Sequence, residues 1–130
     1  MSEETLTHIL YVEDDLDIQA VAQIALEIVG GLSLKTCSSG AEALATANAG
    51  FVPDLLLLDV MMPNMDGPTT LAELRKLPAT ANTPVIFMTA KVQSAELDFY
   101  TSLGAIGVIA KPFDPMELSS QVRALWNKAA

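Results

Sequence analysis

Four consecutive leucines run directly into an acid, and this segment, LLLLD at residues 55–59, constrains the fold more than any other part of the chain. The run is bounded by Pro53 and Pro63 and is too short for a typical helix. It favours a strand buried on both faces, as in a parallel sheet covered by helices. A carboxylate is costly inside such a sheet. We therefore expect Asp59 at the C-terminal end of the strand, at the edge where open α/β sheets bind ligands.

Strand-like apolar segments alternate with helical patterns along the whole chain. Strands are predicted at residues 8–12, 32–36, 54–58, 84–89 and 107–110. Helices are predicted from Ile18 to the glycine pair at 30–31, from the capping-box pattern at 39–42, at 68–77, at 94–102 and after 114–117. Five strands alternating with five helices predict an α/β fold, in which a parallel sheet with right-handed crossovers carries helices on both faces.

The first and last helices carry the most specific local predictions. In the first, apolar residues recur at helical spacing, which predicts a buried face made of Ile18, Val21, Ala22, Ala25, Ile28 and Val29. Before the last, residues 114–117 match an N-cap, a first-turn proline and a third-position acid, and the helix carries Leu118, Val122 and Leu125 on one face. The helix predicted at 94–102 shows no clean period, so its packing is the least defined.

Length and charge limit the classes of function. The 130 residues fit one domain, so we expect a single domain over 1–130 with no output domain after Ala130. A formal charge of −9 argues against unaided binding to nucleic acid or to anionic lipid. The acidic start MSEETLTH lacks a signal-peptide pattern, and no apolar run is long enough to span a membrane. The single cysteine, Cys37, excludes an internal disulfide and is interpreted as a small buried strand residue. These features predict a cytoplasmic protein.

Polar side chains follow four of the five predicted strands. They are Glu13, Asp14 and Asp15 after the first strand, Asp59 after the third, Thr89 after the fourth and Lys111 after the fifth. In a parallel sheet these groups meet at one edge, so we expect carboxylates, a hydroxyl and an ammonium in one crevice. Clustered carboxylates repel one another unless a cation is present, and oxygen ligands without paired His or Cys favour Mg²⁺, with Mn²⁺ as the alternative. Such a site suits a phosphoryl ligand, and a carboxylate can itself attack phosphorus to form an acyl phosphate.

Each of these residues alone also has a structural interpretation. Asp14 or Asp15 can cap a helix, a threonine at a strand end is usually a strand residue, and a Lys-Pro pair is usually on the surface. An acid directly after an apolar strand, such as Asp59, is more specific. Structural interpretations would have to hold at four separate places along one edge of the sheet, so the combination favours a functional site.

Together, the segments ILYVEDD, LLLLDVMMPNMDG, PVIFMTA and GVIAKPF resemble, in order and spacing, the receiver domain of bacterial two-component response regulators. The resemblance extends from about Thr7 to Lys128. It implies a flavodoxin-like sheet with strand order 2-1-3-4-5 and a cis peptide bond between Lys111 and Pro112. It also implies partners: a histidine kinase or a histidine phosphotransfer protein as the phosphoryl donor, and an unknown downstream protein target.

The resemblance implies roles for the acids of this edge. Asp59 matches the aspartate that is phosphorylated, and Glu13 and Asp14 match the acidic pair that holds Mg²⁺ together with Asp59. The backbone carbonyl of Met61 matches the remaining protein ligand of the metal. Two further acids receive structural roles: Asp15 a supporting or helix-capping role, and Asp66 that of a helix cap.

The resemblance also assigns the groups that respond to the phosphoryl group. Thr89 matches the switch hydroxyl and Lys111 the lysine that pairs with the phosphoryl oxygens, while Met61 and Lys91 occupy the two variable positions that tune hydrolysis of the acyl phosphate. Val108 is a departure, since the family usually has Tyr or Phe three residues before the lysine. A valine cannot swing as an aromatic ring does, so we expect phosphorylation to survive and switching to use another movement.

These expectations give one leading function and two alternatives. The leading function is a Mg²⁺-dependent phosphoacceptor, not an enzyme, that signals by conformational switching or passes the group on in a phosphorelay. One alternative is a receiver-like module that binds partners without phosphorylation. The other is a phosphatase with an aspartyl-phosphate intermediate, which is disfavoured because Met61 stands where the common form of that chemistry has a second Asp. The kinase, the target, the phosphoryl lifetime and the oligomeric state stay open.

Overall fold

The computed structural model describes residues 5–129. Ala130 lies outside the described residues, and so does the acidic start at 1–4, where no signal-peptide pattern was found. Five parallel strands form one sheet in the order β2-β1-β3-β4-β5. Their bounds are β1 His8–Val12, β2 Ser33–Cys37, β3 Leu55–Asp59, β4 Val85–Thr89 and β5 Ala105–Ala110. The predicted parallel sheet and its strand order are confirmed, and every strand boundary lies within two residues of its prediction.

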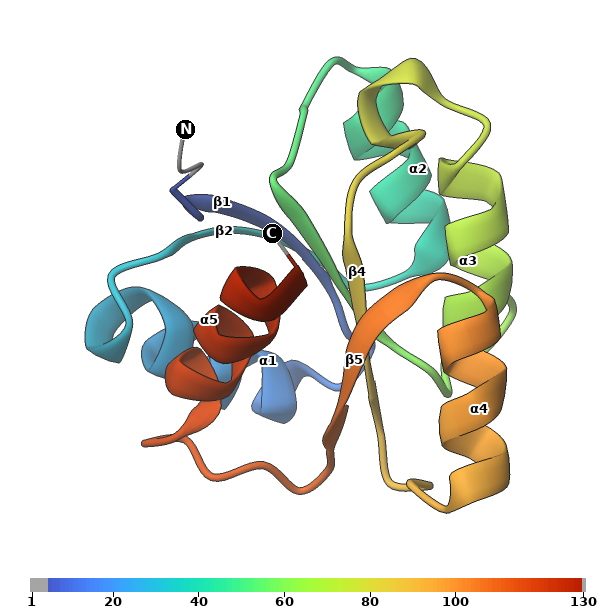
Figure 1. Ribbon diagram of the computed structural model, residues 1–130. Helices are drawn as coiled ribbons and strands as arrows, with labels where there is room; N and C mark the ends of the chain where they lie inside the picture. The colour runs from blue at the N-terminus through green and yellow to red at the C-terminus, as the bar shows by residue number, and fades with distance from the viewer. Residues whose placement is uncertain (1–4, 130) are drawn as a thin grey trace.

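Helices cover both faces of this sheet (Figure 1). Their bounds are α1 Leu16–Gln23, α2 Gly40–Asn48, α3 Gly67–Leu74, α4 Ser94–Ser102 and α5 Leu118–Ala129, with a π-helix η1 at Ile24–Val29 and a short 3₁₀-helix η2 at Pro78–Thr80. Figure 1 shows α1 and α5 on one side of the strands and α2, α3 and α4 on the other. Within residues 5–129, no helix has the length and apolar character needed to cross a bilayer.

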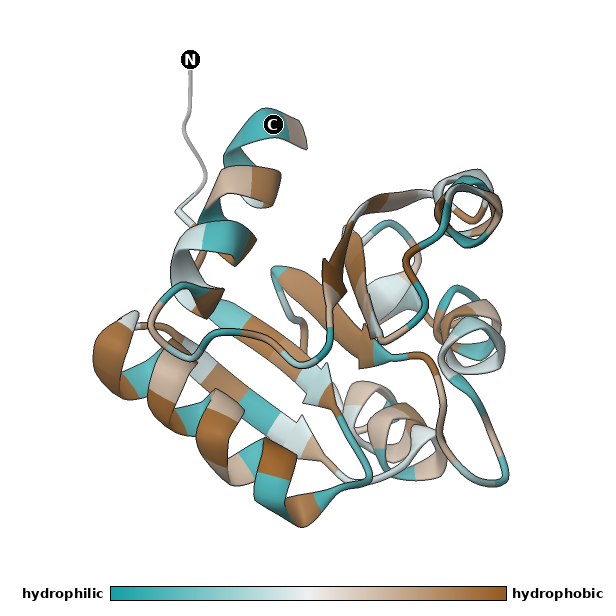
Figure 2. Ribbon diagram, turned by 90° about the horizontal axis from the view of Figure 1, so that it is seen from below, coloured by the Kyte–Doolittle hydropathy of each residue, from teal (hydrophilic) through white to brown (hydrophobic). Residues whose placement is uncertain are grey.

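Each face of the sheet has its own hydrophobic core. Along β3 the leucines alternate between the two: Leu57 packs beneath α1, η1 and α5, and Leu58 packs beneath α2, α3 and α4. Figure 2 shows the apolar segments running through the strands and banded apolar and polar segments along the helices. Burial of one leucine side chain contributes about 1.5–3 kcal/mol, so the run LLLLD is a strand because both of its faces are covered. Cys37, at the end of β2, is buried as predicted.

The first helix departs from the predicted packing. Ala22 and Ala25 are buried as expected, but Val21, Ile28 and Val29 are 42, 78 and 46% exposed. From Ile24 the chain continues as a π-helix, whose turns hold more residues than α-helical turns. The wider turn rotates the later side chains away from the predicted face. The prediction was therefore wrong for Ile28 and Val29, because it assumed one helical period to the glycine pair, and Val21, which precedes the π-helix, instead borders an open cavity.

Two other helix boundaries differ from prediction. The third helix ends at Leu74 instead of Leu77, because the N–H groups of Lys76 and Leu77 bond to carbonyls only three residues back and tighten the last turn. The last helix begins at Leu118, later than the predicted cap at Asp114 requires. The Asp114 carboxylate instead accepts a hydrogen bond from the backbone of Met116 at 2.9 Å, which stabilises a turn before the helix. The weakest prediction, the helix at 94–102, matches α4.

Candidate functional site

Two buried carboxylates leave the sheet side by side at its C-terminal edge. In the pairing of β1 with β3, Val12 lies opposite Leu58, which brings the next residues, Glu13 and Asp59, together. Glu13 is 1% exposed and Asp59 is 3% exposed. The predicted position of Asp59 at the end of the leucine strand is confirmed.

The ammonium group of Lys111 lies between these two carboxylates. Its Nζ donates hydrogen bonds to Glu13 Oε1 at 3.0 Å and to Asp59 Oδ1 at 2.8 Å. The backbone N–H of Lys111 donates to the carbonyl of Thr89 at 2.9 Å, which ties the residue after β5 to the end of β4. The peptide bond from Lys111 to Pro112 is cis, as the resemblance implies. One cation thus serves two buried acids.

Burial dominates the electrostatics of this group. Burial raises the pKa of Glu13 to about 7, the hydrogen bond from Lys111 opposes the shift, and the charge of Asp59 adds to it. The pKa of Asp59 is also raised by burial, again against the effect of Lys111. Burial alone would lower the pKa of Lys111, but its bonds to Asp59 and Glu13 raise it above the ordinary value, so the ammonium stays charged. One ammonium leaves the carboxylates undercompensated, which favours uptake of a further cation.

Three acids form an oxygen-donor cluster at this edge. One carboxylate oxygen from each of Glu13, Asp14 and Asp59 lies within 4.8 Å of the others. Asp14 is exposed, so the cluster is open to solvent on one side. An oxygen-only donor set with room for water fits Mg²⁺, which usually retains several water ligands. Met61, whose carbonyl the resemblance adds to the ligands, is 67% exposed.

Thr89 reaches the same edge but is not bonded to the acids. It ends β4 and is 3% exposed. Its hydroxyl accepts a hydrogen bond from the backbone N–H of Lys91 at 3.0 Å, so it is turned toward its own loop. Lys91 itself is exposed. The structure therefore places Thr89 at the edge that carries Asp59, with its hydroxyl oxygen bonded to the backbone of its own loop.

Val108 occupies the position of the expected aromatic residue. It lies opposite Phe87 in the pairing of β4 with β5 and packs, partly buried, against the core beneath α2, α3 and α4. Phe87 in turn contacts the ring of Tyr100 on α4, with ring centroids 5.2 Å apart. The aromatic pair next to Val108 thus comes from β4 and α4 and not from β5.

Both predicted helix caps are confirmed. The Asp15 carboxylate accepts hydrogen bonds from the backbone N–H groups of Asp17 and Ile18, at 2.9 and 3.1 Å, at the start of α1. The Asp66 carboxylate accepts one from Thr69, at 2.8 Å, at the start of α3. Neither acid belongs to the oxygen-donor cluster.

Two residues that support the site were not predicted. The Gln19 amide donates to the backbone carbonyl of Glu13 and to the Ser38 hydroxyl, which fixes the loop that carries Glu13. At Gly67, any Cβ would collide with the backbone oxygen of Asp59. In the sequence, Gly67 is marked only as the last residue of the segment LLLLDVMMPNMDG, and no pattern marks Gln19.

An open cavity of about 430 Å³ lies beside the site, between α1 and residues 111–113. Its walls are mainly apolar, with Ile18 and Val21 on one side and Phe113 on the other, and Lys111 lies at its margin. This cavity explains why Val21 is partly exposed despite its place on the helix. Lys111 therefore borders both the charged crevice and the apolar cavity.

Comparison with known sequences agrees with this geometry. The sequence profile described as the response regulator receiver domain matches residues 9–123. The transcriptional regulatory protein CpxR homolog of Haemophilus influenzae is 34% identical over 125 residues, which are 96% of this chain and 52% of that protein. The response regulator SaeR of Staphylococcus aureus is 32% identical, over 95% of this chain and 52% of that protein. The chain spans about half the length of the curated relatives it matches.

Comparison with solved structures gives the same result for the fold. The chemotaxis response regulator CheY4 of Vibrio cholerae superposes with a TM-score of 0.83 at 27% identity, over 93% of this chain and 99% of that chain. The receiver domain of the Francisella response regulator 1452 superposes with a TM-score of 0.81 at 29% identity, over 95% of this chain and 99% of that chain.

Proposed function

This chain belongs to the family of response regulator receiver domains, and on that premise we propose that Asp59 accepts a phosphoryl group from a histidine of a histidine kinase or of a histidine phosphotransfer protein. The observation that carries the proposal is the group of Asp59, Glu13 and Lys111. A nearly buried carboxylate at a strand end is held by an ammonium beside a second acid. Such an arrangement stabilises a negatively charged group transferred onto Asp59.

The transfer forms one bond and breaks one. An oxygen of Asp59 attacks phosphorus, the bond from phosphorus to the donor's imidazole nitrogen breaks, and its electron pair stays on that nitrogen, which takes up a proton. Lys111 holds Asp59 in place before transfer and neutralises phosphoryl oxygens after it. Glu13, Asp14, Asp59 and the Met61 carbonyl are the proposed ligands of Mg²⁺, which supplies further charge neutralisation when bound.

The signal is carried by the residues that have to move. In this proposal the Thr89 hydroxyl leaves the N–H of Lys91 and donates to a phosphoryl oxygen. Val108 is too small to follow as an aromatic side chain would, so the change spreads through β5 and α4 by another movement, and the output is either switching or phosphorelay. Exposed Met61 and Lys91 flank the path of water to the acyl phosphate and set its lifetime. Single-domain organisation over 1–130 stays a prediction, which the mass of the protein isolated from its cells will check.

The function is tested by intact mass spectrometry. Wild-type protein, Asp59→Asn and the control Asp98→Asn, which changes an exposed acid on α4, are incubated with acetyl phosphate with and without Mg²⁺. We expect one phosphate adduct, dependent on Mg²⁺, in the wild type and in Asp98→Asn, and none in Asp59→Asn. An adduct that persists in Asp59→Asn would refute Asp59 as the acceptor. The absence of an adduct with acetyl phosphate and with any phosphohistidine donor would favour the partner-binding module, and rapid phosphate release in repeated turnover would favour the phosphatase.

A further inference from the structure

Tyr11 carries a buried hydroxyl group without a hydrogen-bond partner. The residue lies on β1 and is 0% exposed. In the part of the chain that the structure describes, no donor or acceptor contacts its hydroxyl oxygen. A buried hydroxyl that has given up water without gaining a partner is costly, and such groups are rare in folded proteins. No sequence pattern marks this group, because tyrosine is an ordinary residue in a strand.

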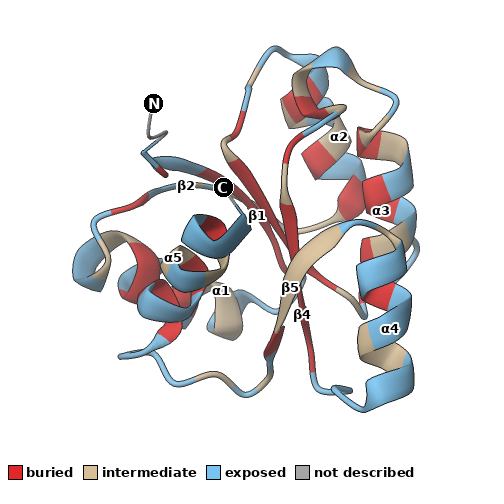
Figure 3. Cartoon of the chain, in the orientation of Figure 1, coloured by how far each residue is buried: buried red, intermediate tan, exposed pale blue. Residues whose placement is uncertain are grey.

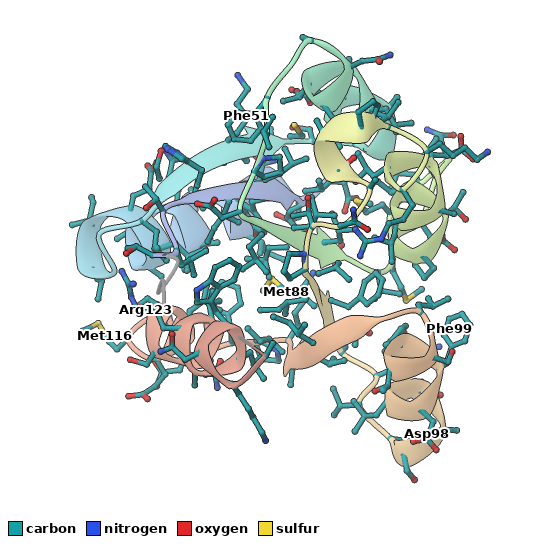
Figure 4. The ribbon with its side chains drawn as sticks, turned by 45° about the horizontal axis from the view of Figure 1, so that its top comes forward. Phe51, Met88, Asp98, Phe99, Met116 and Arg123 are labelled. Atoms are coloured by element: carbon teal, nitrogen blue, oxygen red, sulfur yellow. The ribbon has the colours of Figure 1, made fainter. Side chains whose placement is uncertain are left out.

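The position of Tyr11 connects it with the phosphoacceptor site. Alternate residues of a strand point to the same face, so Tyr11 lies on the face of β1 that also carries Glu13. On that face it packs in the core with Leu57, two residues before Asp59 on β3, and with Met88, which lies opposite Asp59 on β4. Figure 4 shows Met88 in the interior of the molecule, between the strands and the helices. The ring of Tyr11 therefore forms part of the floor beneath the two buried acids.

The electrostatics of Tyr11 agree with this placement. Burial raises its pKa above the ordinary value, and the negative charges of Glu13, Asp59 and Asp15 raise it further. The hydroxyl is thus a neutral donor in a field of carboxylates. What it lacks is an acceptor within reach.

Glu13 is the acceptor whose partners change when the site is used. Its Oε1 accepts from Lys111 at 3.0 Å, and its Oε2 accepts from the backbone N–H of Asp15 at 3.2 Å. If Lys111 turns its donors to a phosphoryl group on Asp59, as the proposed function requires, Glu13 shares or loses its strongest donor. Glu13, which also belongs to the proposed Mg²⁺ ligands, then has a weakened bond from Lys111 or has lost it, and a buried hydroxyl short of an acceptor lies on the same face of the strand.

We propose that Tyr11 is a positioning residue for Glu13, whose carboxylate accepts a hydrogen bond from the Tyr11 hydroxyl, directly or through one buried water, when Asp59 carries a phosphoryl group. This inference rests on the proposed function and extends it by one residue. The bond holds Glu13 in place while Lys111 serves the phosphoryl group. Tyr11 does not touch the reacting atoms.

The test follows the tyrosine hydroxyl directly by NMR. The chain contains two tyrosines, so protein labelled with ¹³C at tyrosine Cζ gives two signals, and Tyr100→Phe identifies that of Tyr11. Spectra are recorded for the protein alone, with Mg²⁺, and with Mg²⁺ and beryllium fluoride, a stable mimic of a phosphoryl group. We expect the Tyr11 signal to move in the direction of a donated hydrogen bond, and its hydroxyl proton to exchange more slowly, only in the last state. The Tyr100 signal serves as the internal reference.

The rate of adduct formation gives a second readout. Tyr11→Phe removes one oxygen and no carbon, so its fold is checked by its amide spectrum and then its adduct formation is measured by mass. We expect formation about two- to tenfold slower than in the wild type, the size of one net hydrogen bond. The matched variant Tyr100→Phe, which removes the same atom on the other face of the sheet, should leave the rate unchanged.

The outcomes separate this inference from the function on which it rests. A wild-type protein that forms no adduct refutes the proposed function, and the inference with it. If the adduct forms but the Tyr11 signal stays fixed, or Tyr11→Phe forms it at the wild-type rate, the inference is refuted and the function stands. A Tyr11→Phe variant that is merely more stable would identify the hydroxyl as an unpaired group without a role.

Discussion

β4 and β5 are neighbouring parallel strands, but they differ strongly in burial. All five residues of β4 are buried, whereas Ile109 is the only buried residue of β5. Figure 3 shows this contrast as a red β4 beside a tan β5. β4 lies between two strands, while β5 is the edge of the sheet. Both strands nevertheless supply residues of the site, since β4 ends in Thr89 and β5 leads to Lys111. One side of the crevice is therefore more firmly packed than the other.

The helix next to β5 is also less anchored than the helix before it in the chain. Tyr100 is the one buried residue of α4, and Figure 4 shows Asp98 and Phe99 projecting from α4 away from the sheet. Among residues 5–129, no side chain caps α4 at its N-terminus, whereas Asp66 caps α3. Segments held by few buried contacts open at the lowest free energy. We therefore expect the edge formed by α4 and β5 to respond first when the charge of the crevice changes.

The same truncation on the two strands tests the comparison most directly. Ile86 on β4 is 0% exposed, and Ile106 on β5 packs only partly against the same core. We expect Ile86→Ala to lower the free energy of unfolding by about 3–5 kcal/mol, because a full cavity opens, and Ile106→Ala by about 1–2 kcal/mol. Urea unfolding followed by circular dichroism measures both. Equal losses would show that β5 is as firmly packed as β4, and the comparison would fail.

For the polar groups at the two strand ends, we expect the substitution after the less buried strand β5 to slow adduct formation more than the substitution at the end of β4. Lys111→Met keeps the length of the side chain but removes the charge shared by Glu13 and Asp59, so we expect the adduct to form about a hundredfold more slowly. Thr89→Ala removes a hydroxyl that is turned to its own loop, so we expect a loss of about tenfold.

The exposed neighbour Lys91 provides the matched control, since Lys91→Met removes an ammonium without a bond to Asp59. Its rate should stay within a few-fold of wild type. Adduct formation is measured by intact mass and the fold by circular dichroism. An unfolded Lys111→Met protein would identify Lys111 as a structural residue, contrary to the proposal.

The stability of the metal-free protein should fall as pH rises from about 4.5 to about 7. Burial raises the pKa of Glu13 from 4.5 to about 7, so in this window the folded state holds a proton that the unfolded state has released. Stability falls with pH wherever the native state binds more protons, at no more than about 1.4 kcal/mol per pH unit for one group. Asp59, whose pKa is also raised by burial, acts in the same direction.

The variant Glu13→Gln separates the contribution of Glu13 from that of the other titratable groups of the protein. The variant removes the group and should flatten the pH dependence of unfolding between these limits, measured by urea unfolding at several pH values without Mg²⁺. Saturating Mg²⁺ should flatten it too in the wild type, because binding favours the ionised carboxylates. A wild-type stability that rises across this window would contradict the assigned burial of Glu13.

The sequence was sufficient for the parts of the molecule that local patterns determine. The leucine run predicted β3 and the position of Asp59, and the parallel sheet that it implied brought Glu13 and Lys111 to the same edge. Patterns failed where tertiary packing chose among local options. The π-helix turns Ile28 outward although its spacing is helical, and the last turn of α3 tightens without a marking residue.

Sequence patterns also did not predict the groups that support the site. Gln19 lies at an ordinary helix position, and only the fold brings its amide to the Glu13 carbonyl. Tyr11 has the identity of a common strand residue, and its significance lies in a hydroxyl that meets no partner. Such roles depend on distances between elements that are remote in the chain, which periodicity does not specify.

The smallest predicted effect strengthens the weaker of the two regions. α4 begins after Gln93, and its third residue is Glu96, so Gln93→Ser creates the capping-box pattern S-x-x-E. In the described chain, one carboxylate oxygen of Glu96 is buried without a partner and is available for the reciprocal bond. We expect a gain in unfolding free energy of about 0.5–1 kcal/mol and slower amide hydrogen exchange confined to α4. Gln93→Ala, which cannot cap, should give neither.

Because the cap lies outside the crevice, the rate of adduct formation should not change, whereas any switching that depends on a loosely held α4 should weaken. If amide hydrogen exchange in α4 is unchanged in Gln93→Ser, packing against β5, and not the uncapped helix terminus, limits the stability of this edge.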